Sequence, residues 1–199
     1  SEDLLNFPLL VVLSPSRISY GDFKSDGTDV RFVDSSGSAL EFHIEKWDTS
    51  GSSYVWVRVP KITANSASDY VWLYYDNPSA PVQGPAATFD SNFVGVWHLN
   101  ETSGPVRDST SNVNHGTPSG AAYTSSGMID GGYSFDGVND YIRVPASTSL
   151  NLIGGSFTME AWVRFSTVNN ARLISRSIDA TSNNAYQLIS DEATKTWGV

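Results

Sequence analysis

The chain has 199 residues, a length that fits one large β domain or two small ones. Its net charge is −9, from 21 acidic and 12 basic residues, and this argues against nucleic-acid binding because phosphate contacts need clustered Lys and Arg. The absence of cysteine excludes disulfides, thiolate nucleophiles and cysteine-based metal sites. No apolar run approaches the about 20 residues that span a bilayer, and the first residues lack the order of a signal peptide.

Alternation of apolar and polar residues with a period of two recurs through the first 80 residues, whereas helical periodicity is almost absent. The expected strands cover residues 7–13, 29–33, 39–47, 54–60 and 69–75. The side chains predicted to share the inner faces are Leu40, Phe42, Ile44, Val55, Val57 and Val59. Residues 69–75 are apolar on both faces, which indicates a strand covered on both sides or one with an aromatic outer face. The pattern predicts a small antiparallel β-sandwich in residues 1–80.

A proline-rich stretch then separates this sandwich from a second domain. Residues 81–88 read as a short, stiff linker. The second domain is expected at residues 89–199, with strands at 157–165, 172–177 and 185–190. In the first of these strands alternate residues should face inward, namely Phe157, Met159, Ala161, Val163 and Phe165. The predicted fold class is therefore all-β throughout.

Catalytic residues are not evident. Glycoside cleavage needs two carboxylates flanking the bond, and the best candidate strand, residues 157–165, offers only Glu160. His43, His98 and His115 are far apart in sequence, and no nucleophile-elbow motif accompanies them. We expect no enzymatic activity.

Two loops are rich in the oxygen ligands that calcium prefers. The candidate metal ligands are Asp108 and Asn112 in residues 108–114, and Asp136 and Asp140 in residues 136–140. The alternative is that Asp108 and Asp136 only cap turns through nearby backbone amides.

Aromatic residues suggest a sugar ligand, because Trp and Tyr rings stack on pyranose rings. By alternation the tryptophans that could face outward are Trp47, Trp56, Trp72 and Trp162. Aromatic strands in sandwiches are also often covered by a second sheet or a neighbouring domain. The sequence alone therefore assigns no ligand-binding residue.

Residues 4–80 resemble an uncharacterised β-domain family that often precedes laminin-G-like modules in bacterial and archaeal surface proteins. The similarity rests on several phrases in the same order, namely NFP (6–8), DVRF (29–32), LEFHIEKW (40–47), YVWVRVP (54–60) and YVWLYYDNP (70–78). Family members usually carry one more strand before the position of Ser1.

The second domain resembles the opening half of a laminin-G-like, concanavalin A-type jelly roll of the pentraxin-related branch. The similarity rests on residues 93–104 (FVGVWHLNETSG), 107–116, 133–145 and 156–165 (SFTMEAWVRF). It implies a structural calcium near Asp108 and Asn112, and an extracellular or cell-surface location. It also implies further strands, so the jelly roll is expected to be incomplete within these 199 residues.

Three functions follow as hypotheses. The first is a non-catalytic, carbohydrate-binding or adhesive module whose partner is a glycan or polysaccharide. The second is a structural subunit whose open strand edges are completed by strands of other subunits. The third is a fragment of a larger surface protein of the glycoside hydrolase type.

Overall fold

The computed structural model describes residues 2–82, 87–152, 154–167, 171–177, 184–190 and 197–198. Its regular structure consists of antiparallel strands and one short 3-10 helix, η1 (Tyr20–Asp22), which confirms the predicted all-β fold. The strands are β1 (Leu4–Leu13), β2 (Arg31–Asp34), β3 (Ala39–Leu40), β4 (Phe42–Lys46), β5 (Ser53–Ile62), β6 (Val71–Tyr74), β7 (Thr117–Ser119), β8 (Ala122–Thr124), β9 (Gly132–Ser134), β10 (Tyr141–Arg143), β11 (Arg172–Ser177), β12 (Asn184–Ser190) and β13 (Trp197–Gly198).

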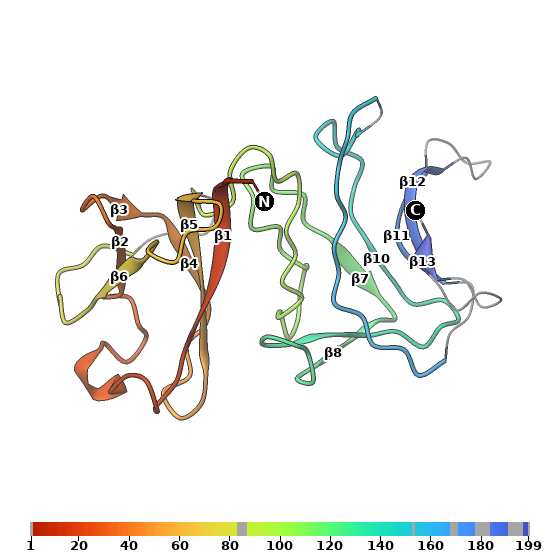
Figure 1. Cartoon of the computed structure of the whole chain (residues 1–199). Coiled ribbons are helices and arrows are strands. Elements are labelled where there is room, and N and C mark those ends of the chain that lie inside the picture. Colours follow the sequence, from red (N-terminus) through yellow and green to blue (C-terminus); the bar gives the residue numbers. More distant parts are fainter. Residues whose placement is uncertain are drawn as a thin grey trace.

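Strands β1 to β6 form two three-stranded sheets, with orders β1-β5-β4 and β3-β2-β6, at one end of the molecule (Figure 1). A single hydrophobic cluster joins the two sheets, and burial follows the predicted alternation. The buried members of that cluster are Leu13, Val30, Phe32, Leu40, Phe42, Val55 and Val57. The predicted inner faces of β4 and β5 are therefore confirmed.

The expected strand 39–47 is divided into β3 and β4 by Glu41. The carbonyl oxygen of Glu41 accepts a hydrogen bond from the backbone amide of Arg58 in β5, with an N···O distance of 2.8 Å. Within this one stretch the chain passes from the sheet that contains β2 to the sheet that contains β5. The alternation could not predict this, since both sheets bury the same side of the stretch.

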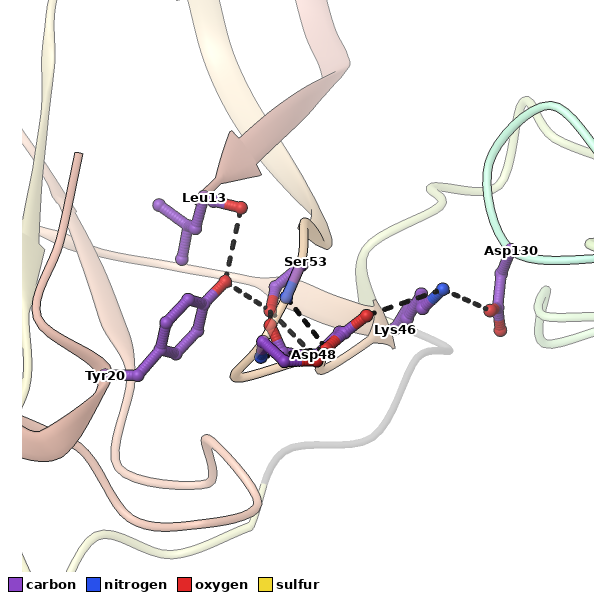
Figure 2. Close-up of polar contacts among 8 residues, drawn as sticks. Leu13, Tyr20, Lys46, Asp48, Ser53 and Asp130 are labelled. Carbon is purple, nitrogen blue, oxygen red and sulfur yellow. Dashed lines mark hydrogen bonds and ion pairs between the residues drawn. The ribbon is translucent and has the colours of Figure 1, made fainter. Parts of the chain in front are cut away.

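A buried polar contact closes the end of the first sandwich (Figure 2). The Tyr20 hydroxyl lies 2.7 Å from Oγ of Ser53 and 3.2 Å from the carbonyl oxygen of Leu13. Ser53 is fully buried, and its Oγ also accepts a hydrogen bond from the backbone amide of Asp48. These bonds satisfy polar groups that burial would otherwise penalise, and they tie η1 to β5.

The second part of the chain contains three small sheets, β7 with β10, β8 with β9, and β11-β12-β13 (Figure 1). Strands β11 and β12 confirm the expected strands at 172–177 and 185–190. The strand expected at residues 157–165 was predicted wrongly, because these residues are extended but belong to no sheet. Its alternating apolar residues find no partner strand among the described residues, so Phe157 and Val163 stay 42% exposed.

The two parts of the chain touch through an ion pair as well as through packed side chains. Nζ of Lys46, at the end of β4, lies 3.5 Å from a carboxylate oxygen of Asp130 and 4.0 Å from one of Asp48 (Figure 2). The expected linker, residues 81–88, lies partly outside the described residues. In the part of the chain that is described, no helix is long and apolar enough to cross a membrane.

Candidate functional site

Three aromatic side chains form a row on the outer face of β6, which we call the aromatic strip (Tyr70, Trp72 and Tyr74). Alternate residues of a strand share a face, so Val71 and Leu73 turn inward and pack against the core. The strip side chains are 53%, 54% and 56% exposed, in chain order. The outer face of residues 69–75 is therefore aromatic and uncovered, which resolves the two alternatives that the sequence left open.

The sheet holds the strip at its edge. Trp72 lies opposite Val33 of β2, while β6 pairs with no strand on its other side among the described strands. The Tyr70 and Trp72 rings meet edge to face, with centroids 5.4 Å apart and planes at 77°. Beyond the strip, Tyr75 stacks on Phe23 with centroids 4.2 Å apart, which anchors the end of β6. Large rings that stay exposed on a supported edge strand mark an interaction surface.

The other candidate tryptophans differ in their surroundings. The Trp47 ring packs against Tyr20 at a centroid distance of 5.2 Å, so it belongs to the sandwich interior. Trp56 is covered by Phe89. Trp162 is 78% exposed, but it stands apart from the strip, at a position outside the described sheets. Sequence reasoning had named Trp72 without its two tyrosine neighbours, although their alternate spacing was the available signal.

Asp108, the first candidate calcium ligand, is a buried hydrogen-bond acceptor that organises its own loop. Its Oδ1 accepts from the backbone amides of Val96 and Thr110, each at 2.9 Å. Its Oδ2 accepts from the Thr110 hydroxyl at 2.8 Å and from the backbone amide of Asn114 at 2.9 Å. A carboxylate offers about four lone-pair directions. All four are occupied by N–H or O–H donors, so this conformation leaves Asp108 no direction for a cation.

The other three candidate ligands also serve turns. The Asn112 amide nitrogen donates to the carbonyl oxygens of Phe93 and Val94, at 3.3 and 3.4 Å. Asp136 accepts from the backbone amide of Val138 at 2.8 Å, and Asp140 accepts from the backbone amide of Asp136 at 2.9 Å. Within the described ranges, no group of three or more His, Asp or Glu side chains could hold a metal ion. The four residues do not fit a calcium site in this arrangement, and calcium binding stays a prediction.

A buried polar cluster, the histidine–glutamate cluster (His43, Glu45, Trp56 and His98), lies on the outer face of the sheet β1-β5-β4. Glu45 occupies a β-bulge in β4, since the register with β5 shifts between Ile44 and Lys46. Its Oε2 accepts hydrogen bonds from Nε1 of Trp56 and from Nδ1 of His98, the latter at 3.1 Å. The side chains of Glu45 and His98 are only 2% and 9% exposed.

The cluster joins parts of the chain that are far apart in sequence. The His43 and His98 rings lie with centroids 5.0 Å apart, although 55 positions separate them, and Phe89 packs against both His98 and Trp56. Nε2 of His98 is buried and has no hydrogen-bond partner among the described residues. Sequence reasoning treated the histidines as unrelated. The alternation placed His43 and Glu45 on one face of a strand, but nothing in the sequence linked them to His98.

Burial and charge shift the titration of this cluster. Desolvation, with repulsion from His98, lowers the pKa of His43 to about 4, against a weaker attraction to Glu45. Desolvation raises the pKa of Glu45, but the hydrogen bonds from His98 and Trp56 and the attraction of the two histidines outweigh it, so its pKa lies below the ordinary value. The cluster is buried and packs residues 89–98 against β4 and β5, so it forms a structural contact between the sandwich and residues 89–98.

Glu160 is exposed and lines a groove of about 390 Å³ beside Trp162. The remaining described residues of the groove lining are apolar, namely Met159, Ala161, Val163, Leu173 and Leu188. Among the described residues of the lining, Glu160 is the one carboxylate.

Comparison with known families finds a match for part of the chain. Residues 26–104 match the model of a family described as a domain of unknown function (DUF2341). No curated protein and no solved structure matches the chain. The expected similarity to an uncharacterised domain family is therefore confirmed for this span, which starts after β1 and continues past residue 80. The matched span contains the aromatic strip and every member of the histidine–glutamate cluster.

Proposed function

We propose that this chain is a non-catalytic, carbohydrate-binding module of a secreted or cell-surface protein, with the aromatic strip as its glycan-binding face. The observation that carries the proposal is the row of three rings, each more than half exposed, on the outer face of β6. Exposed Tyr and Trp offer apolar faces for sugar rings and polar groups for their hydroxyls. A folded protein that needed these rings only for its core would bury them.

Two further features support a binding role. The proposal includes the sequence resemblance of residues 93–165 to laminin-G-like jelly rolls, which would make the second part a binding module. The groove beside Glu160 contains one carboxylate among its described residues, which favours binding over hydrolysis.

The test is binding to a broad glycan array and to immobilised polysaccharides. We expect Trp72→Ala to reduce binding at least about tenfold, since large aromatic residues dominate such contacts. Trp162→Ala is the matched control, because it removes another exposed tryptophan outside the strip. Binding that survives Trp72→Ala would remove the strip from the proposal, and no binding to any glycan would reject the function.

Self-assembly through strand completion is a second candidate function, and residues 156–165 favour it. Residues 156–164 of this segment have the alternation of a strand but belong to none of the described sheets. It borders the apolar groove with Leu173 of β11 and Leu188 of β12. A strand from a second copy of the chain could pair with the segment and cover the groove by β-augmentation.

A further inference from the structure

The geometry points to a particular class of ligand for the aromatic strip: a single, extended, uncharged polysaccharide chain that lies along β6. This inference rests on the proposed function and defines the length, the packing state and the charge of the glycan. Each of the three properties follows from a separate feature of the strip.

The length of the ligand follows from the spacing of the rings. Successive strip residues are two positions apart, with Trp72 and Tyr74 in β6 and Tyr70 directly before it, so at the rise of extended backbone the first and last are separated by about 13 Å. This exceeds the size of one sugar ring, so a monosaccharide cannot contact all three aromatic side chains. A linear chain parallel to β6 can, and the strip's two tyrosines would present hydroxyls along its path.

The packing state follows from the ring orientation. The Tyr70 and Trp72 planes are inclined at 77°, so their faces cannot both lie against one flat surface. A crystalline polysaccharide presents such a surface, whereas a single chain can turn between the two rings. The free side of β6 adds backbone groups that no described strand pairs with, and these can hydrogen-bond the hydroxyls of a single chain.

The charge follows from the groups at the ends of the strip. Asp69 precedes it, and hydrogen bonds from the Thr63 amide and the Ser66 hydroxyl lower the pKa of Asp69, so this carboxylate stays ionised. The nearby cations are already engaged. Nζ of Lys61 lies 2.7 Å from a carboxylate oxygen of Asp3, and the Arg31 guanidinium donates to backbone carbonyl oxygens.

With a net charge of −9, the protein would repel an anionic polymer, and both Lys61 and Arg31 already have partners within the protein. An uncharged ligand avoids this cost. Binding should therefore depend little on salt.

The experiment is native affinity electrophoresis of the full chain in gels that contain soluble β-glucan, xylan or galactomannan. Parallel assays use polygalacturonate as the anionic polymer and microcrystalline cellulose and chitin as crystalline ones. We expect retardation by at least one uncharged soluble polymer, unchanged between low and moderate salt, and competition by an oligosaccharide but not by its monosaccharide. Trp72→Ala and Tyr74→Ala should each weaken retardation about tenfold or more, while Trp162→Ala should not.

The outcomes separate the two levels of the proposal. Strip-dependent binding only to polygalacturonate or to a crystalline polymer overturns the ligand class but keeps the binding function. Equal competition by monosaccharide and oligosaccharide does the same. No retardation by any polymer rejects both, and if Trp72→Ala then changes the oligomeric state in light scattering, the strip is a protein contact. Circular dichroism spectra that match the wild type show that the variants are folded.

Discussion

At the scale of single residues, Asp108 shows how a candidate metal ligand can have a different role. An Asp in a loop with Asn and Ser is typical of a calcium site. The same pattern is typical of a turn in which the Asp side chain accepts hydrogen bonds from nearby backbone amides. The structure places Asp108 at 6% exposure with four donors around it, including the Asn114 amide six positions away. The Asp108 carboxylate thereby accepts hydrogen bonds from backbone amides that, in a sheet, would be paired with backbone carbonyl groups.

Asp108→Ala should destabilise the protein by about 3 kcal/mol or more, because three backbone amides lose their buried acceptor. The loss should be equal in calcium and in chelator, since the donors belong to the protein. Urea unfolding under both conditions measures it. Asp136→Ala is the control, because Asp136 lies in an exposed turn and its removal should cost less than about 1 kcal/mol.

The calcium hypothesis gives the opposite result in the same experiment. If calcium raises the melting temperature of the wild type, and Asp108→Ala removes that response while leaving stability in chelator unchanged, Asp108 is a ligand. Its donors would then have to rearrange to admit the cation.

At the scale of elements, the sequence predicted which side chains of each sandwich strand face inward. It did not predict which segment of the chain packs on the outer face. Alternation placed Phe42 and Val57 inward because a period of two is local. It could not show that residues 89–98 cover the outer face of β4 and β5, since that contact depends on packing between distant segments. The same limit hid the histidine–glutamate cluster. The sequence signal for this cluster is the presence of polar side chains on a face of β4 that other residues bury.

The histidine–glutamate cluster should make stability depend on pH. Unfolded His43 binds a proton near pH 6.5, whereas the buried, folded side chain has a pKa of about 4. The unfolded state therefore holds more protons in this window, and stability falls as pH drops from about 6.5 to 4, by up to about 3 kcal/mol. Glu45, whose folded pKa is lowered, adds stability above its ordinary pKa that is lost at still lower pH.

Unfolding free energies measured by urea titration between about pH 3 and 7.5 check this prediction. His43→Gln removes the titrating group at position 43, so the free energy of unfolding should change little between pH 6.5 and 4. The loss of stability at lower pH should remain. Parallel curves for wild type and variant in that window would contradict the assignment of the pKa shift to His43.

At the scale of the whole molecule, the chain combines a closed sandwich with a second part of small, separate sheets. The first six strands surround one hydrophobic cluster, so the resemblance to a small β domain predicted their architecture well. The second part has short sheets and an extended segment that crosses it (Figure 1), of which residues 156–164 belong to none of the described sheets. Strand propensity alone predicted a strand there. A strand also needs a neighbour, and none of the described strands pairs with this segment.

The position of residues 156–164 outside the described sheets predicts concentration-dependent association. A strand from a second copy that pairs with residues 156–165 would cover Val163 and the groove that it lines. Light scattering after size-exclusion chromatography should show masses above the 21.6 kDa monomer as concentration rises.

Val163→Lys should restore the monomer, because it would bury an unpaired charge in the contact. Val138→Lys is the matched control, since Val138 is 85% exposed in a turn outside the groove lining and should leave association unchanged. A wild-type chain that stays monomeric at every concentration would exclude self-completion of this edge and leave glycan binding as the function to pursue.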